Sequence, residues 1–268
     1  MLVLAAVPDL QAARLRRAAA GRFALARAVA WDEALDTIRR RPVEVAVVDP
    51  LLAGEARAHE IQRLRVLFPS LPLILYTTLT PRTAAVLLQL GQCGLEHVVF
   101  ARYDDHPARL REVLAQEEVR STSRRLLDQL GVALAGLPGE LRWVLAEALR
   151  APDEVQTVGQ AVARARIDRR RWERWLTRLA LPSPRHFLAA ARVLYAHRLL
   201  QDPGFTIDDV AKRLGYAQTR TLQLHARAYL GLTAGEMRFS LSPDEAVERV
   251  TRRFLKPQPH AARRLSVS

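Results

Sequence analysis

Residues 1–115 alternate between short apolar runs and longer stretches in which apolar residues recur at helical spacing. The short runs have the length of buried β-strands, and the periodic stretches have one apolar face, as surface helices do. Because the runs are continuously apolar, both faces of the resulting sheet should be covered. The expected strands are residues 2–7, 23–30, 43–49, 71–77 and 96–100. The expected helices are residues 8–20, 31–41, 58–68, 81–92 and a last one that begins at 107.

Strands that alternate with helices along a chain form parallel sheets. Five such units within residues 1–115 predict a flavodoxin-like α/β domain with a five-stranded parallel sheet, whose sites lie at the carboxyl ends of the strands. Asp49 ends the third expected strand and Thr77 ends the fourth. This order and spacing resemble the receiver domain of bacterial response regulators. The resemblance implies that Asp49 holds the place of the phospho-acceptor, and Thr77 that of the family's serine or threonine.

The magnesium-binding part of a receiver is missing from the sequence. The resemblance aligns Ala5 and Ala6 with the family's acidic pair, and Ala101 with its lysine. Asp9 lies beyond the first strand, where an acid is equally well explained by the dipole of the following helix. Phosphoryl transfer depends on a cation that neutralises the developing charge. We therefore expect a pseudo-receiver, with phosphorylation control through Asp49 as the alternative.

The rest of the chain is predicted to be helical. Residues 116–152 read as a connector of two amphipathic helices, which pack either on their own domains or on a second copy of the chain. Residues 153–240 contain two repeats of a short helix, a turn and a second helix. Residues 241–268 are expected to form a short helix, opened by Ser242 and Pro243, and a basic tail.

The second repeat has the clearest local signals. Thr206 and Asp209 form a capping-box-like pair, and Gly215 breaks the first helix where a left-handed residue is needed. The following helix, about residues 218–229, turns its apolar positions inward, and these are Leu222, Ala226 and Leu230.

The first repeat covers residues 157–179, and its second helix begins near Asp168 and buries Trp172 and Leu176. Between the repeats, Ser183 and Pro184 open a linker helix that runs to about Leu200, with serine as the cap and proline in the first turn.

This layout resembles the DNA-binding domain of the AraC/XylS family of bacterial transcription regulators. The matching features are Ser183-Pro184, the pattern R-x-x-x-A-x-x-L-L from Arg192 to Leu200, IDDVAKRLGY at 207–216, GLT at 231–233 and Arg238. The chain departs from the family at Ala226, where a large aromatic is usual, at Leu224, where an arginine is frequent, and at Arg166, where the turn glycine is usual. The resemblance implies sequence-specific binding to double-stranded DNA.

The outward residues of the two second helices are the predicted DNA contacts. Arginine, threonine and glutamine in the leading turns of a helix suit base edges in a major groove. The expected base contacts are Arg170, Glu173, Arg174, Thr219, Arg220 and Gln223. The expected phosphate contacts are Arg169, Arg171, Arg178 and Arg227. A linker helix of about 25 Å can space the two recognition helices by about one DNA turn, roughly 34 Å.

The composition agrees with an anionic partner. The formal net charge is +13, and arginine carries nearly all of the positive charge because the only lysines are Lys212 and Lys256. An arginine-rich composition also follows from a GC-rich genome, which explains part of this excess. The lone cysteine, Cys93, excludes an intrachain disulfide, and no apolar run reaches membrane-spanning length. We therefore expect a cytoplasmic protein with no membrane contact.

No cluster of residues predicts catalysis, a cofactor or a bound metal. The sequence has no glycine-rich phosphate loop, no nucleophile elbow and no set of metal ligands at a suitable spacing. Cys93 and His97 are four residues apart, but Gly94 interrupts the helix between them. We therefore expect a protein that is not an enzyme and carries no cofactor and no metal.

The leading hypothesis is a DNA-binding transcriptional regulator that forms a homodimer through residues 1–135, with RNA polymerase as a further partner. The dimer surface would draw on Val86, Leu87 and Leu90 of the helix at 81–92, and on the helix after Pro107. An alternative is a protein-interaction adaptor with a basic surface, which would lack sequence-selective and salt-dependent duplex binding.

Overall fold

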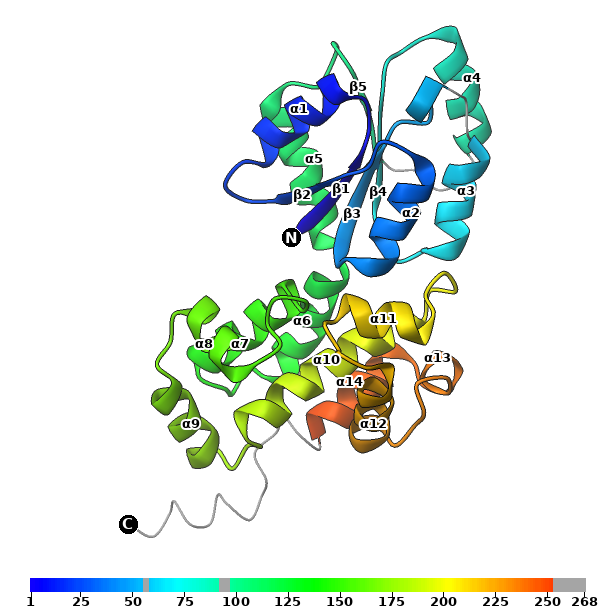
Figure 1. Ribbon diagram of the computed structural model, residues 1–268. Coiled ribbons are helices and arrows are strands. Elements are labelled where there is room, and N and C mark those ends of the chain that lie inside the picture. The colour runs from blue at the N-terminus through cyan, green and yellow to red at the C-terminus, as the bar shows by residue number, and fades with distance from the viewer. Residues whose placement is uncertain (55–57, 92–96, 253–268) are drawn as a thin grey trace. The chain divides into compact units, whose positions relative to one another are not determined.

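The computed structural model describes residues 1–54, 58–91 and 97–252 (Figure 1). The chain divides into two compact units. The first consists of Met1–Thr122 together with Asp202–Phe205, and the second contains the remaining residues. The predicted domain limits at 115, 152 and 240 stay predictions.

The first unit is built on a parallel sheet whose strands lie in the order β2-β1-β3-β4-β5. The strands are β1 (Leu2–Ala6), β2 (Ala24–Arg27), β3 (Val43–Val48), β4 (Leu73–Thr77) and β5 (His97–Phe100). This confirms the flavodoxin-like fold. Strand β2 is shorter than predicted because the N–H of Val29 donates to the carboxylate of Glu33, at 2.7 Å, and so leaves the strand.

Helices cover both faces of this sheet, as the continuously apolar strands predict. The helices are α1 (Asp9–Ala19), α2 (Trp31–Arg40), α3 (Ala58–Leu67), α4 (Pro81–Leu90) and α5 (Pro107–Val119), with a short 3-10 turn η1 (Leu52–Gly54) after β3. Helices α1 and α5 lie on one face, and α2 and α3 on the other (Figure 1). Alternate strand residues such as Val3, Val47 and Tyr76 form one apolar core with α1 and α5.

The second unit is helical in its described part and surrounds one long helix. The helices are α6 (Thr122–Ala133), α7 (Gly139–Arg150), α8 (Val158–Ala165), α9 (Arg169–Arg178), α10 (Pro184–Leu200), α11 (Ile207–Arg213), α12 (Thr219–Leu230), α13 (Met237–Ser240) and α14 (Pro243–Val250). Helix α10 packs against α7, α8, α9, α11, α12, α13 and α14. It is buried along most of its length, including the polar side chain of His197, so it forms the axis of this unit.

Local signals in the sequence set several helix starts. The side chain of Thr206 accepts a hydrogen bond from the N–H of Asp209, and the Asp209 side chain accepts one from the N–H of Thr206, which completes the predicted capping box. Ser242 caps α14 in the same way. The prediction for Ser183 is wrong in part: it stands at the N-cap position with Pro184 next to it, but its side chain makes no capping hydrogen bond.

Three further sequence predictions concern the connector, Cys93 and membrane spans. Helix α7 of the predicted connector packs against α8 and α10 of its own chain. Cys93 lies outside the described residues. None of the described helices combines the length and the apolar character that a membrane span needs.

Candidate nucleic-acid interface

Helix α12 has one buried face and one exposed face. The buried residues are Leu222, Ala226, Tyr229 and Leu230. The exposed face carries Arg220, Gln223, Leu224 and Arg227. These positions follow the i, i+3, i+4, i+7 spacing of one helical stripe. Among the described residues, Arg220 has no acidic partner, so its guanidinium is available to a ligand. Arg227 lies near enough to Glu236 for their charges to interact.

The turn before α12 orients this face. Gly215 has φ +70°, in the left-handed region that glycine adopts without steric cost. The hydroxyl of Thr219 donates to Oδ1 of Asp208 on α11, at 2.7 Å. Asp208 also pairs with Lys212 at 2.6 Å, and the hydrogen bonds from Lys212 and Thr219 lower the pKa of its carboxyl. Thr219 therefore links α11 and α12. Because its hydroxyl proton is used in this bond, Thr219 can only accept a hydrogen bond from DNA.

Helix α9 is oriented by its own cap and by two buried side chains. Oδ1 of Asp168 accepts from the N–H of Arg171 at 2.8 Å, and Trp172 and Leu176 are buried as predicted. The opposite side carries Arg170, Arg174 and Arg178, which line a shallow groove together with Asp168, Glu173 and Thr177. This groove therefore contains three arginines and two acidic residues.

The arginines of α9 differ in what they contact. Arg169 pairs with Glu173 at 2.9 Å, and Arg171 pairs with Glu140 of α7 at 2.6 Å. The guanidinium of Arg178 lies over the ring of Trp175, 5.8 Å from its centroid. Among the described residues, Arg170 and Arg174 have no acidic partner. These two arginines are therefore the least constrained cations of α9.

The turn of the first repeat is left-handed although it lacks a glycine. Arg166 ends α8 with φ 52° and ψ 45°. A residue with a Cβ adopts this region at a cost of roughly 1–2 kcal/mol. The turn of the first repeat is therefore left-handed at a residue type that does not favour this conformation.

Sequence reasoning missed Leu224 as a candidate contact. Its side chain is 56% exposed, and it stands one turn after Arg220 on the exposed stripe of α12. The sequence contained a signal for this contact, because Leu224 replaces the arginine that is frequent at this position in the family that the sequence resembles.

At the carboxyl edge of the sheet, Asp49 is buried, with 4% of its surface exposed. Its backbone N–H donates to the carbonyl of Ala6, so β1 brings an alanine beside it where a receiver has an acid. Oδ1 of Asp49 accepts hydrogen bonds from Thr77 and from the N–H of Leu51, each at 2.9 Å. Burial raises the pKa of the Asp49 carboxyl, and these hydrogen bonds offset only part of the effect.

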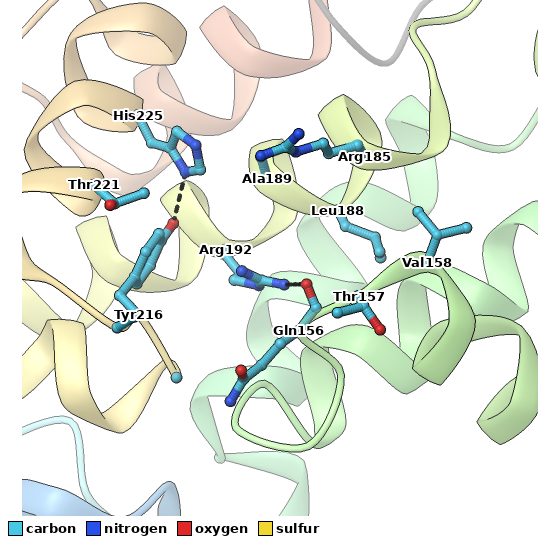
Figure 2. A pocket seen from close by; sticks show the side chains of 12 residues that line it. Gln156, Thr157, Val158, Arg185, Leu188, Ala189, Arg192, Tyr216, Thr221 and His225 are labelled. Atoms are coloured by element: carbon cyan, nitrogen blue, oxygen red, sulfur yellow. Dashed lines mark hydrogen bonds between the residues drawn. The ribbon is translucent and has the colours of Figure 1, made fainter.

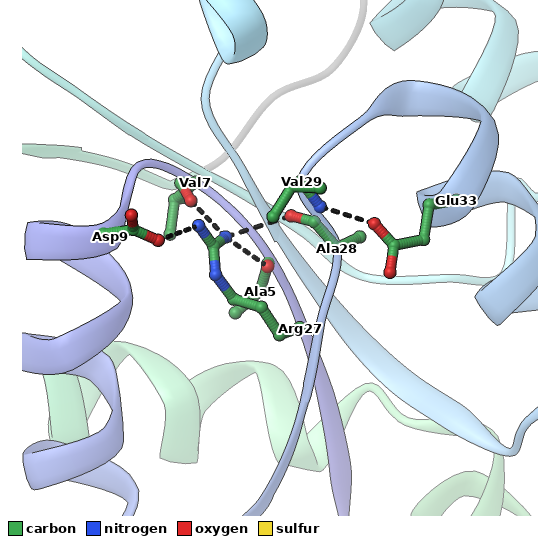
Figure 3. A network of polar contacts seen from close by, with 7 residues as sticks. All are labelled: Ala5, Val7, Asp9, Arg27, Ala28, Val29 and Glu33. Atoms are coloured by element: carbon green, nitrogen blue, oxygen red, sulfur yellow. Dashed lines mark hydrogen bonds and ion pairs between the residues drawn. The ribbon is translucent and has the colours of Figure 1, made fainter.

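A guanidinium group lies at the end of β1 (Figure 3). Nη1 of Arg27 donates to the carbonyls of Ala5, at 3.2 Å, and Ala28, at 3.0 Å, and to that of Val7. Nη2 pairs with Asp9 at 2.8 Å. Asp9, the acid that follows β1 in the sequence, is therefore already held by a cation. The described residues contain no group of three or more His, Cys, Asp or Glu side chains that could hold a metal ion.

The same edge of the sheet contains a second acid, Asp105, which is held on several sides. The hydroxyl of buried Tyr76 donates to its Oδ2 at 2.7 Å, the N–H of Arg102 donates to its Oδ1 at 3.0 Å, and Arg14 pairs with Oδ2. Burial acts to raise the pKa of Asp105, but the hydrogen bonds from Tyr76 and Arg14 outweigh it and the pKa is lowered. Asp105 is thus a carboxylate that fastens β4 and α1 to the loop after β5.

Comparison with known proteins identifies part of the second unit. Residues 161–239 match the family model described as a helix-turn-helix domain. The chain carries a helix-turn-helix domain. The matched region begins within α8 and ends within α13, so it includes both α9 and α12.

Solved structures and curated proteins add little to this. Full-length FixJ from B. japonicum is similar at 13% sequence identity, covering 81% of this chain and 98% of that chain with a TM-score of 0.37. A likeness of that score carries no weight, and the fold of the first unit is established by its own strand order. No curated protein sequence matches the chain.

Proposed function

We propose that the chain is a sequence-specific transcriptional regulator that places α9 and α12 in successive major-groove segments of double-stranded DNA. The observation that carries the proposal is the exposed stripe of α12, on which Arg220 has no acidic partner among the described residues, inside a region that matches a helix-turn-helix domain. Arginine can bind a guanine edge bidentately, and glutamine can do the same to adenine.

The contacts of the arginines refine the predicted division of roles. We assign base reading to Arg170, Arg174, Arg220 and Gln223, and phosphate binding to Arg178 and Arg227. Each of the other predicted contacts already has a partner in the protein. Thr219 donates to Asp208, Arg169 and Glu173 pair with each other, and Arg171 pairs with Glu140. These side chains reach DNA only by sharing or leaving those partners.

The test is selection of bound sites from a pool of random duplexes with the purified full chain. We expect enrichment of a site with two conserved segments about one DNA turn apart, roughly 10 base pairs. Binding that remains uniform across the pool, while still weakening with salt, would contradict sequence reading and leave only a basic surface.

We further propose that the first unit works without phosphorylation. Asp49 is buried, Ala6 lies beside it, and Arg27 holds the nearby Asp9. None of these contacts offers a magnesium ion a carboxylate pair. After incubation of the full chain with acetyl phosphate and magnesium, mass spectrometry should show no phosphate on Asp49. Stoichiometric phosphorylation that is absent from the Asp49→Asn variant would overturn this proposal.

A homodimer through residues 1–135 is the remaining part of the proposal. The structure corrects the surface expected for it: Val86 and Leu90 are buried, whereas Leu88 is 82% exposed on α4. A large exposed apolar side chain of this kind suits a contact with a second copy. Sedimentation of the full chain should give a dimer at tens of micromolar, which Leu88→Glu weakens and its neighbour Gln89→Glu does not. A monomer at that concentration would remove the dimer from the proposal.

A further inference from the structure

A pocket of about 440 Å³ lies between the two repeats of the helix-turn-helix unit (Figure 2). Its wall is formed by the segment before α8, the first half of α10, the turn between α11 and α12, and α12 itself. The lining residues are Gln156, Thr157, Val158, Arg185, Leu188, Ala189, Arg192, Gly215, Tyr216, Ala217, Thr221 and His225. Both repeats contribute to it, so it depends on their arrangement around α10.

The charged groups of this pocket are all basic. Arg185 and Arg192 come from α10 and His225 from α12, and no lining residue is acidic. Figure 2 shows these three side chains around the same space. The pKa of His225 is lowered, first by burial and then by the positive charges of Arg192, Arg185 and His186. The positive charge of the pocket therefore comes from Arg185 and Arg192, and no carboxylate in its walls offsets it.

The guanidinium of Arg192 is held in place by contacts that use only part of its N–H donors. Its Nη2 donates to the carbonyl of Val155, at 3.2 Å, and to that of Gln156. Its guanidinium lies over the ring of Tyr216, 5.7 Å from the centroid. Its Nε is buried and has no hydrogen-bond partner in the described structure. Arg192 lines the pocket, and its guanidinium has more N–H donors than the two carbonyls accept, so it can also donate to an anion there.

Two helices also begin at this pocket. Helix α8 starts at Val158, and α12 starts at Thr219, between the lining residues Ala217 and Thr221. The dipole of a helix favours an anion at its start. The start of α8 is already capped by the side chain of Thr157, which accepts from the N–H of Gln160. Gln218, the N-cap residue of α12, makes no side-chain capping bond.

We propose that this pocket binds a phosphate group. Arg185 and Arg192 offer the guanidinium donors that phosphate oxygens accept, and the helix starts add partial positive charge. The inference rests on the proposed function for one source of that phosphate, the DNA backbone between the two groove segments. A free phosphate-bearing molecule is the other source, and the experiment separates them.

Substitutions at Thr221 test the pocket without removing its supports. Thr221→Glu puts a carboxylate in the pocket wall and in the first turn of α12, where it favours the helix, so the variant should fold. Thr221→Gln is the neutral match. Arg185→Gln removes an exposed pocket cation, and Arg124→Gln on α6 removes the same charge elsewhere in the unit.

The first arm measures binding of the full chain to its selected duplex. Arg185→Gln should weaken binding about three- to tenfold and reduce the salt slope by about one, and Thr221→Glu should weaken it further. Thr221→Gln and Arg124→Gln should change affinity less than twofold or so. Backbone phosphates should then be replaced one at a time by methylphosphonate. At one position the replacement should weaken DNA binding by the wild type but not by Arg185→Gln.

The second arm uses inorganic phosphate at constant ionic strength and follows the imidazole signals of His225 by NMR in the full chain. Phosphate should shift these signals in the wild type and in Thr221→Gln, but not in Thr221→Glu. A response in this arm alone assigns the pocket to a free phosphate-bearing ligand, and it is informative even if no duplex is selected. If neither methylphosphonate at any position nor phosphate acts through Arg185 and Thr221, the proposal is wrong.

Discussion

The hydroxyl of Thr77 donates a hydrogen bond to Oδ1 of Asp49, with 2.9 Å between the two oxygens. These residues end neighbouring parallel strands, β4 and β3, so their meeting follows from the strand order. In this chain the pair is buried, and the neighbouring residue of β1, whose carbonyl accepts from the N–H of Asp49, is Ala6. Asp49 is therefore a titrating group whose charged form is disfavoured by its surroundings.

Asp49→Asn should stabilise the first unit at neutral pH. Burial raises the folded-state pKa of Asp49 above its value in the unfolded chain, so the protonated form favours folding at low pH. That contribution is lost as pH rises through the folded-state pKa, and the neutral asparagine avoids the loss while still accepting from Thr77 and Leu51. Urea unfolding of the two proteins between pH 4 and 8 should show a gap that widens with pH. A gap independent of pH would exclude titration of Asp49 as the cause.

Tyr76→Phe should destabilise the first unit by about 1–3 kcal/mol, because it removes a buried hydrogen bond to the carboxylate of Asp105. The lowered pKa of Asp105 makes its contribution to stability present above the ordinary aspartate pKa and lost as pH falls through the folded-state value. The difference between wild type and variant should therefore shrink in acid. Leu15→Ala, a substitution in the same apolar core, serves as the control with a pH-independent cost.

How far the sequence predicted the molecule depends on how local each interaction is. The Thr206–Asp209 box and the turn at Gly215 were predictable because residues a few positions apart determine them. The fold followed from strands and helices whose apolar positions have different periods. The Arg171–Glu140 pair, the Arg27 contacts at the end of β1 and the pocket around Arg192 join distant residues through side-chain conformations, which no local pattern specifies. For the same reason, the missing cap bond at Ser183 could not be foreseen from residue type.

Arg166→Gly should stabilise the second unit by up to about 1 kcal/mol, because glycine adopts the left-handed conformation without the Cβ penalty but gains freedom in the unfolded chain. Gly231→Ala is the reverse control. Gly231 has φ +72°, and an added Cβ would meet nothing within 4 Å, so only backbone strain acts there. It should destabilise by about 1 kcal/mol. Thermal unfolding should give a higher midpoint temperature for Arg166→Gly and a lower one for Gly231→Ala. Shifts of the same sign would contradict this prediction.

Arg220→Ala should relax base preference at one position of the selected site and cost about 1–3 kcal/mol on that site. On random duplexes the same variant should lose much less. Arg178→Ala should weaken specific and random duplexes alike, because phosphate contacts carry no sequence information. Competition binding with both kinds of duplex checks this, and equal losses for Arg220→Ala on the two would remove its role in base reading.

Leu224 should contact a thymine methyl group. It is the apolar member of an otherwise polar exposed stripe, and the C5-methyl of thymine is the apolar feature of the major groove. Replacing the contacted thymine by deoxyuridine should weaken the wild type by about 1 kcal/mol, the value of one buried methyl group. Leu224→Ala should show a smaller penalty for the same replacement. If deoxyuridine is tolerated at every position of the selected site, Leu224 does not read DNA in this way.

Helix α10 is buried along most of its length and packs against both repeats, so it behaves as a stiff spacer between α9 and α12. One added base pair between the two DNA segments lengthens their separation by about 3.4 Å and rotates one segment by roughly 35° relative to the other. A stiff spacer cannot follow that rotation, so the duplex has to twist or bend to fit it. The energy of this deformation depends on the base steps between the segments. Flexible pyrimidine–purine steps there would favour binding without being touched by any side chain.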